Sequence, residues 1–308
     1  MSRGILLPGQ GAQFEGMGRD WCEAFPVARD TFAEADETLG FSLSSACWES
    51  GDEVNRTDVA QPGIFTTSVA ILRVLEEKGL VLADAALCAG LSLGEYTALW
   101  AAGSLEFADG LRLVRLRGEA MQAASEAIPS SMVSLMGADE ATARELAAVG
   151  AEAGICSVAN INAPGQVIVS GELAALERVE AQARDHGVRR ARRLVVAGGF
   201  HSECMRPAAE RLAVALEEVE LRAPRVTFLN NVSGGPVEDP ATIRQQLADQ
   251  VCAPVLWEKS MRWALGQGVN HFLEPGPGQV LAGILRKIDA DARVDSAATA
   301  AEAADFTP

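Results

Sequence analysis

The sequence is poor in aromatic residues and contains no long apolar run. Only 5% of its 308 residues are Phe, Trp or Tyr, whereas 48% are hydrophobic, so we expect a mainly aliphatic core. No apolar run is long enough to span a membrane, and the apolar part of the N-terminus is too short for a signal peptide. These features predict a cytoplasmic protein without a membrane partner.

Paired cysteines and a basic composition are also missing. The six cysteines are scattered singly without a C-x-x-C pair, which argues against a zinc site and against a disulfide framework. The 26 Lys and Arg residues are outnumbered by 42 Asp and Glu residues, and the net charge is −16. Because phosphate binding needs a basic surface, this charge disfavours a nucleic-acid partner. We expect no bound metal and no permanently bound cofactor.

Neither glycine-rich loop of the sequence completes a nucleotide-binding motif. Gly9-Gln-Gly11 is followed by Phe14 where the third glycine would stand, and Gly276-Pro-Gly278 is followed in the same way by Leu281. The G-x-x-x-x-G-K-[ST] pattern does not occur either. A dinucleotide-binding module is therefore disfavoured.

The most informative motif is Gly90-Leu-Ser-Leu-Gly94, a G-x-S-x-G pattern. An apolar run at 85–89 leads into it, and a strongly helix-forming segment at 95–102 follows it. Strand, tight turn and helix are the context of a nucleophile elbow, in which flanking glycines make room for a strained serine. Ser92 would then lie at a helix N-terminus, where N–H groups stabilise an oxyanion. The alternative is an ordinary serine in a glycine-flanked turn.

A serine nucleophile needs a base, and the chain has three histidines. His186 stands at an expected helix end, and His271 opens an apolar strand, where a structural role is favoured. His201 lies in a glycine-flanked loop between two expected domains, and such clefts commonly hold sites. We therefore assign His201 as the general base for Ser92, with His271 as the alternative. No acidic residue stands out as a third member, and a backbone carbonyl could orient the histidine as well.

Arg117 is the most informative charged residue. It falls on the apolar side of an expected helix at 108–127, at helical spacing from Leu113 and Ala120. A buried arginine must find an anion, and a carboxylate bound through two hydrogen bonds is its natural partner. The partner is either an internal Asp or Glu or the carboxylate of a substrate. Helix geometry alone slightly favours the internal partner.

The order of expected elements between residues 129 and 197 differs from the rest of the chain. It is strand, helix, two hairpin strands, helix and a last strand at 193–197, which is the ferredoxin-like order. We expect a small domain at 129–197, inserted into a larger domain formed by 1–128 and 198–308. The tail beyond Asp289 has no periodicity, so we expect it to be frayed.

Motifs spread from about residue 4 to residue 288 together resemble the malonyl-CoA:acyl-carrier-protein transacylase family. They occur in the family's order, which makes the set more specific than any single motif. They are Leu6-Leu-Pro-Gly-Gln-Gly-Ala-Gln13, Gln61-Pro62, Gly90-Leu-Ser-Leu-Gly-Glu-Tyr96, Val114-Arg-Leu-Arg-Gly118, Met121-Gln122, Asn160-Ile-Asn-Ala-Pro-Gly-Gln166, Gly199-Phe-His-Ser202, Asn230-Asn-Val232, Pro254-Val-Leu-Trp257 and Glu274-Pro-Gly-Pro-Gly278.

The resemblance implies an α/β-hydrolase-like large domain with a ferredoxin-like insert. It implies that Ser92 carries the acyl group as an ester, with His201 as the base. Backbone N–H groups of Gln10 and Leu93 would form the oxyanion hole. The main-chain carbonyl of Gln250 would orient the histidine, which would explain the missing acid.

Substrate selection also follows from the resemblance. Arg117 would clamp the free carboxylate of a malonyl group, which reverses the preference drawn from helix geometry. Gln61 and Phe200 would belong to the substrate site, and the bulk of Phe200 is similar to malonyl-selective enzymes. The family usually has histidine before the nucleophile, and this chain has Leu91. Some discrete acyltransferases that serve polyketide synthases resemble it there, so we favour a polyketide pathway over fatty-acid synthesis.

The implied reaction takes malonyl from malonyl-CoA and passes it to the phosphopantetheine thiol of an acyl carrier protein. Carrier proteins are acidic, so an arginine cluster becomes a candidate docking patch; without a partner it would be a solvated charge run. The cluster comprises Arg189, Arg190, Arg192 and Arg193. We expect a monomer. The alternatives are an acyl hydrolase, a carrier-to-carrier acyltransferase on the same scaffold, and a non-catalytic carrier-docking protein.

Overall fold

The computed structural model describes residues 2–304 and 306, and its larger part is built on a six-stranded sheet in the order β10-β9-β1-β2-β7-β8. The strands are β1 (Gly4–Leu7), β2 (Leu87–Gly90), β7 (Phe228–Asn230), β8 (Gly235–Pro236), β9 (His271–Pro275) and β10 (Arg293–Ala297). All neighbours are parallel except β7 and β8. The central strands β1 and β2 are buried along their whole length, as expected for a sheet covered by helices on both faces.

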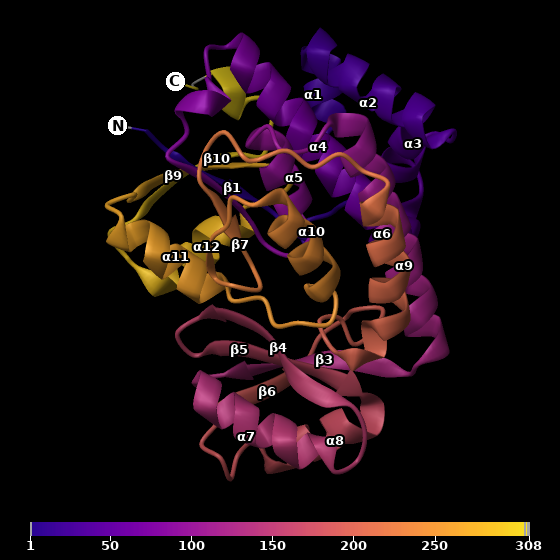
Figure 1. Cartoon of the computed structure of the whole chain (residues 1–308), viewed down its shortest axis with the longest axis vertical. Coiled ribbons are helices and arrows are strands. Elements are labelled where there is room, and N and C mark those ends of the chain that lie inside the picture. The colour runs from indigo at the N-terminus through magenta and orange to yellow at the C-terminus, as the bar shows by residue number, and fades with distance from the viewer. Residues whose placement is uncertain (1, 305, 307–308) are drawn as a thin grey trace.

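Helices cover this sheet and form most of the larger part (Figure 1). They are α1 (Arg19–Ala24), α2 (Pro26–Leu39), α3 (Leu43–Trp48), α4 (Thr57–Glu77), α5 (Gly94–Ala101), α6 (Phe107–Ala127), α9 (Arg206–Glu217), α10 (Pro240–Asp249), α11 (Trp257–Gly266) and α12 (Val280–Ile288). Short 3-10 turns lie at Gly51–Asn55, Leu82–Asp84, Glu203–Met205 and Glu302–Ala304. None of the helices in the described part of the chain combines the length and apolar character needed to cross a bilayer.

A second, four-stranded sheet has the order β4-β5-β3-β6 and is antiparallel throughout. It is formed by β3 (Ser130–Met136), β4 (Cys156–Ala163), β5 (Gln166–Glu172) and β6 (Arg190–Arg193), with α7 (Glu140–Ala151) and α8 (Leu173–Gln182) between them. The β-α-β-β-α-β order expected from the sequence is therefore present. Both helices lie on the side away from the larger part, where they share a small core with the sheet (Figure 1).

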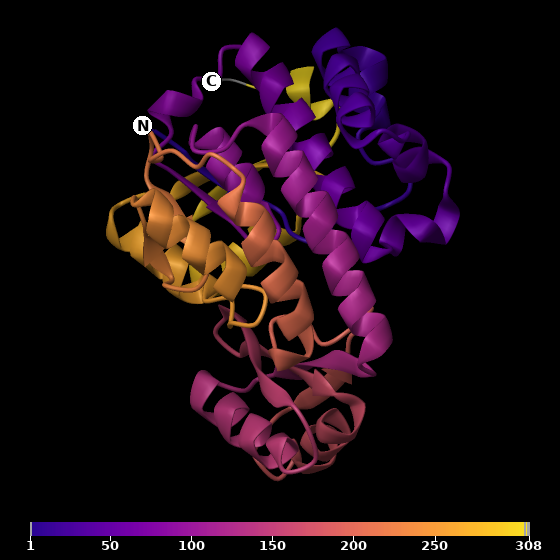
Figure 2. The same cartoon turned by 45° about the vertical axis from the view of Figure 1, so that its right-hand side comes forward.

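The helix-free face of the small sheet is turned towards the larger part. Met132 and Ala159 join the main hydrophobic core, and Ala163 joins the core beneath α11 and α12. Figure 2 shows α6, the long magenta helix, running from the larger part down to the small sheet, where β3 begins. Backbone bonds reinforce the joint, because Val255 exchanges hydrogen bonds with strand β4 at 2.8 and 2.9 Å. The boundaries expected at 128/129 and 197/198 remain predictions.

Two expectations about strands were wrong. The tail beyond Asp289 is not frayed throughout, because β10 pairs with β9 along its whole length. The last strand of the small sheet is β6 at Arg190–Arg193, not 193–197. Both β10 and β6 are edge strands, paired through their backbone on one side only. Their polar side chains give no apolar pattern from which the strand could be predicted.

Candidate active site

Ser92 occupies the sharp turn between β2 and α5. Its φ of 52° lies in the left-handed region, which a residue with a side chain adopts at an energetic cost. The turn requires both flanking glycines: a Cβ on Gly90 would come within 1.9 Å of the carbonyl carbon of Gly94, and a Cβ on Gly94 within 2.2 Å of the Leu7 oxygen. The strained serine and its two crowded glycines are the geometry expected of a nucleophile elbow.

His201 approaches Ser92 from the loop after the small sheet. Its Nε2 lies 2.8 Å from the Ser92 Oγ, and its Nδ1 lies 2.7 Å from the main-chain oxygen of Gln250. A φ of 59° makes His201 the second of two non-glycine residues with positive φ in the described chain, Ser92 being the first. The fold thus holds both partners of one hydrogen bond in costly backbone conformations, as functional sites often do.

The other two histidines lie elsewhere. His271 Nε2 contacts the Asp295 carboxylate at 2.7 Å across strands β9 and β10, and His186 contacts its own helix end through Gln182. Burial is the main reason that the pKa of His201 is lowered to about 4, and the nearby Arg117 charge adds to the effect. The imidazole is therefore neutral near pH 7 and can accept a proton from Ser92. Its Gln250 bond fixes the proton on Nδ1 and leaves Nε2 as the acceptor.

Arg117 projects from α6 to the same point and is 1% exposed. It donates to the Ser92 Oγ at 3.1 Å, to the Gln61 side-chain oxygen at 2.8 Å and to the Gln250 side-chain oxygen at 2.9 Å. Its Nε has no hydrogen-bond partner, and no carboxylate of the described chain forms an ion pair with it. The internal Asp or Glu favoured by helix geometry alone is therefore absent as a direct partner. A buried cation with an unused N–H is a site for an anion.

Two residues beside Ser92 carry backbone N–H groups of interest: Leu93 follows it in the chain, and Gln10 lines the same cleft. Strands β1 and β2 pair in register, Leu7 with Gly90, so the loop carrying Gln10 lies beside the turn that carries Ser92. Leu93 directly precedes α5, where the helix dipole is positive. No hydrogen bond within the described chain uses the N–H of Gln10 or of Leu93. Both groups are free to bind a ligand oxygen.

These groups open into a cleft of about 880 Å³ at the carboxyl ends of the parallel strands. Phe200 lines the cleft next to His201. Gln61 does not line the cleft; it is fully buried, and its side-chain oxygen accepts a hydrogen bond from Arg117. The remaining wall comes from the helix-free face of the small sheet and from the loops after β1 and α3. The cleft is lined by Gly9, Gln10, Gly11, Gln13, Asp52, Asn55, Arg56, Leu91, Ser92, Arg117, Met121, Gln122, Met132, Ser134, Asn160, Asn162, Gln166, Ile168, Leu194, Val195, Val196, Ala197, Phe200, His201, Val280 and Ile284.

The model of the acyl transferase domain family matches residues 6–301, which include the whole of this site. This chain belongs to the acyl transferase family. It is 41% identical over 287 residues to malonyl CoA-acyl carrier protein transacylase of Bacillus subtilis, covering 92% of this chain and 90% of the relative. The resemblance expected from the motifs is therefore confirmed.

Solved structures of acyl transferases agree with this assignment. The chain is similar to an acyl-carrier-protein-S-malonyltransferase of Bartonella henselae, with a TM-score of 0.95, 40% identity and coverage of 99% and 98% of the two chains. It is also similar to a malonyl-transacylase solved in complex with its type II polyketide synthase acyl-carrier protein, with a TM-score of 0.93, 37% identity and coverage of 99% and 98%. The expected fold class, a large α/β part with a ferredoxin-like part, is confirmed.

The arginine cluster of this family member is divided between two faces of the small sheet. Arg192 pairs in register with Ser134, a cleft residue, so both side chains lie on the helix-free face, and Arg190 shares that face. Arg193 lies on the other face, where it forms an ion pair with Glu180 of α8. Within the described chain, Arg189, Arg190 and Arg192 form no ion pair.

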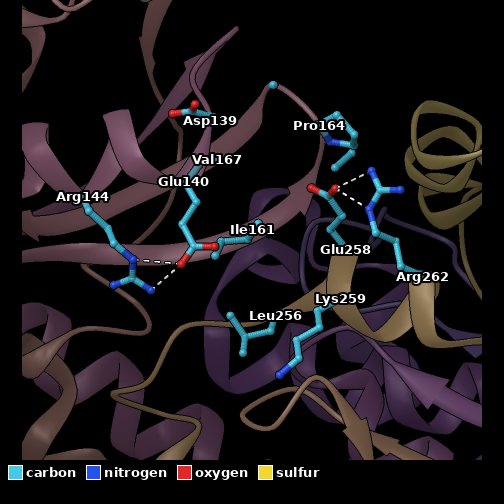
Figure 3. Close-up of a pocket in the computed structure, with 12 residues that line it drawn as sticks. Asp139, Glu140, Arg144, Ile161, Pro164, Val167, Leu256, Glu258, Lys259 and Arg262 are labelled. Carbon is cyan, nitrogen blue, oxygen red and sulfur yellow. Dashed lines mark hydrogen bonds and ion pairs between the residues drawn. The ribbon is translucent and has the colours of Figure 1, made fainter.

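The acyl transferase has a second cavity of about 670 Å³ between the β4-β5 hairpin, α7 and α11 (Figure 3). Both of its arginines have a carboxylate partner: Arg144 pairs with Glu140, and Arg262 pairs with Glu258. Lys259 donates to a main-chain oxygen at 2.8 Å. Among the described residues that line this cavity, no buried side-chain atom lacks a hydrogen-bond partner, whereas Arg117 Nε lacks one at the cleft.

Two polar residues of the site were not expected from the sequence. Asn231 accepts the Ser92 N–H at 2.6 Å and donates to the Gly90 oxygen at 2.8 Å, so its side chain braces the turn. Glu95, in the first turn of α5, is fully buried and accepts the Asn231 N–H at 2.5 Å. Both stand inside motifs that the sequence analysis recognised, but neither motif indicated what the side chain contacts. Among the described residues, no group of three or more His, Cys, Asp or Glu side chains could hold a metal ion.

Proposed function

We propose that this protein transfers a malonyl group from malonyl-CoA, through an ester on Ser92, to the phosphopantetheine thiol of an acyl carrier protein. The observation that carries the proposal is the buried Arg117 guanidinium, which touches the Ser92 hydroxyl and has an unused Nε–H. An acyl group held on Ser92 with a free carboxylate would meet this cation. The transacylase activity named for the relatives supports the same reaction.

The first half-reaction loads Ser92. The Ser92 oxygen attacks the thioester carbonyl carbon while His201 Nε2 takes the hydroxyl proton. The oxyanion that forms is stabilised by the N–H groups of Gln10 and Leu93. The carbon–sulfur bond then breaks, and the CoA sulfur leaves with the proton from His201. The Gln250 carbonyl stabilises the transient imidazolium through Nδ1.

The second half-reaction reverses these steps with a different thiol. The phosphopantetheine thiol gives its proton to His201 and attacks the ester carbon. Ser92 leaves as the alkoxide and recovers a proton from His201 Nε2. The free enzyme is regenerated, so the kinetics are ping-pong.

Phe200 and Leu91 support finer assignments. Phe200 lines the cleft beside His201, and its ring would crowd a substituent on the α-carbon of the acyl group. Leu91 lines the same cleft at the position where the resembling family usually has histidine. We assign the transfer to polyketide biosynthesis on this residue, and a comparison of carrier proteins from polyketide and fatty-acid synthesis tests the assignment.

Intact-mass measurement tests the reaction directly. After mixing with malonyl-CoA, the protein should gain one malonyl mass, and Ser92→Ala should gain none. Adding a carrier protein that bears phosphopantetheine should remove this mass and transfer it to the carrier. Release into water at the same rate without a carrier would instead indicate a hydrolase, and loading from malonyl-carrier but not from malonyl-CoA would indicate a carrier-to-carrier transferase.

A further inference from the structure

Glu95 is a fully buried carboxylate that the reaction described above does not use. Its two oxygens accept separate hydrogen bonds, one from the Asn231 N–H at 2.5 Å and a short one from the Gln250 side-chain Nε2. No Lys, Arg or His of the described chain forms a direct ion pair with it. A fully buried carboxyl group is costly even when neutral donors satisfy its oxygens, so its presence at this position needs a reason.

The Gln250 side chain connects Glu95 to Arg117. Its Nε2 donates to Glu95 and to the Ser92 main-chain oxygen at 3.0 Å, while its Oε1 accepts from Arg117 at 2.9 Å. Both Glu95 oxygens accept hydrogen bonds in the structure, and a guanidinium can only donate them. Glu95 and Arg117 therefore dictate the same orientation of the amide. With the amide reversed, two acceptors would meet at Glu95 and two donors at Arg117.

Glu95 also reaches the catalytic turn by a second route. Asn231 donates its main-chain N–H to Glu95, and the Asn231 side chain binds the Gly90 oxygen and the Ser92 N–H. Glu95 thus binds both Asn231, which holds the turn at Ser92, and Gln250, which holds Arg117.

We propose that Glu95 is a positioning residue for carboxylate selection: it fixes the Gln250 amide with its oxygen towards Arg117, and so holds the guanidinium where an acyl carboxylate on Ser92 would bind. This inference rests on the proposed malonyl transfer. Glu95 does not touch the acyl group. It acts through Gln250, whose main-chain oxygen independently orients His201.

Burial governs the protonation of the groups around Glu95. Burial raises the pKa of Glu95 to about 8, whereas its bonds from Asn231 and Gln250 and the Arg117 charge lower it. The other ionisable groups nearby are Tyr96, next along α5, and His201, whose imidazole is neutral. With a pKa of about 8, Glu95 is mainly protonated at pH 7, so the hydrogen bonds that its oxygens accept, and not a full negative charge, connect it to Gln250 and Asn231.

The test compares Ser92 loading from malonyl-CoA with loading from an uncharged acyl-CoA of similar size, in wild type and in Glu95→Gln. A glutamine at 95 has one acceptor oxygen for two donors, so its NH₂ group opposes either the Gln250 NH₂ or the Asn231 N–H. Glu95 then no longer fixes Gln250 and the Asn231 support of the turn together. The malonyl-to-uncharged ratio of kcat/KM should fall about tenfold, chiefly through KM for malonyl-CoA. An unchanged ratio would overturn the inference.

A double-mutant cycle with Gln250→Met tests the route. Methionine keeps the side-chain length and the main-chain oxygen for His201 but removes both polar ends of the amide. Gln250→Met should reduce the ratio by a similar factor, and adding Glu95→Gln should change it by less than about twofold more. Independent, additive effects would show that Glu95 does not act through Gln250. Should Glu95→Gln fail to fold, an unchanged ratio in Gln250→Met alone would overturn the inference.

Glu274 provides a matched control because it is an equally buried carboxylate. It accepts two N–H groups at the start of α12, each at 2.8 Å, and does not line the cleft. Glu274→Gln should lower the melting temperature and leave the ratio unchanged. If wild type takes up malonyl while Glu95→Gln keeps its ratio, only the role of Glu95 is wrong. If wild type takes up no malonyl, the proposed function itself fails, and the inference with it.

Discussion

Two cavities in the described part of the chain are similar in size and opposite in character. The cavity beside α11 holds about 670 Å³ and the cleft at Ser92 about 880 Å³. In the first, Arg144 and Arg262 each have a glutamate partner. In the second, Arg117 is buried without a carboxylate, and Ser92 and His201 have strained backbones. Unmatched charge and strain persist where a ligand or a reaction can use them, so they indicate the site better than volume does.

The largest expected effect comes from removing the base. His201→Ala leaves Ser92 without a proton acceptor, and malonyl loading should slow by about 10³-fold. The matched control is His271→Ala, because His271 also contacts one acceptor but lies at the β9–β10 edge. Single-turnover loading followed by intact mass measures both variants. Equal losses in the two would mean that His201 acts structurally.

Arg117→Ala should have the next largest effect. Without the guanidinium, loading from malonyl-CoA should fall roughly 10²-fold relative to an uncharged acyl-CoA, because the acyl carboxylate loses its partner. Arg262→Ala in the second cavity removes an arginine from a partly exposed ion pair with Glu258 and should leave the ratio unchanged. The measurement is kcat/KM for both acyl donors. Unchanged malonyl preference in Arg117→Ala would contradict the carboxylate clamp.

A smaller effect concerns pH. The neutral form of His201 accepts the serine proton, and its pKa of about 4 keeps that form dominant down to pH 5. The loading rate should therefore change by less than about twofold between pH 7 and pH 5. A histidine with the ordinary pKa of about 6.5 would lose roughly 30-fold over the same range. Stopped single-turnover reactions in this window distinguish the two, and a midpoint near pH 6.5 would show that His201 is not desolvated.

Much of this site could be predicted from the sequence, because its main residues stand in motifs with a local physical meaning. The glycines around Ser92 indicated the strained turn, and the structure shows the close contacts that require them. The proximity of His201, 109 positions later, could be proposed only from its loop and the resemblance. The partner of Arg117 could not be predicted from helix geometry, because the position of a residue on its helix does not show which side chains of other elements lie near it.

What the sequence did not indicate depends on tertiary contacts. Glu95 is one acidic residue near a helix N-terminus, where a carboxylate is ordinarily solvated. In the fold it is fully buried and accepts from Asn231 and Gln250, which lie 136 and 155 positions later in the chain. Strand β10 was not predicted because an edge strand is held by backbone hydrogen bonds and needs no alternation of apolar and polar residues. For the same reason, the division of the arginine cluster by strand β6 could not be predicted without its bounds.

That division leads to the smallest predicted effect, on carrier binding. Arg190 and Arg192 lie on the helix-free face beside the cleft, whereas Arg193 is engaged with Glu180 on the other face. The double variant Arg190→Gln/Arg192→Gln should raise KM for an acidic carrier protein about 3- to 10-fold at low salt, with a smaller difference at high salt because exposed charges are screened. Arg193→Gln, which removes one positive charge from the opposite face, should change KM by less than about twofold. Steady-state transfer at two ionic strengths measures both, and an equal rise in both variants would mean that the carrier responds to net charge and not to the face beside Ser92.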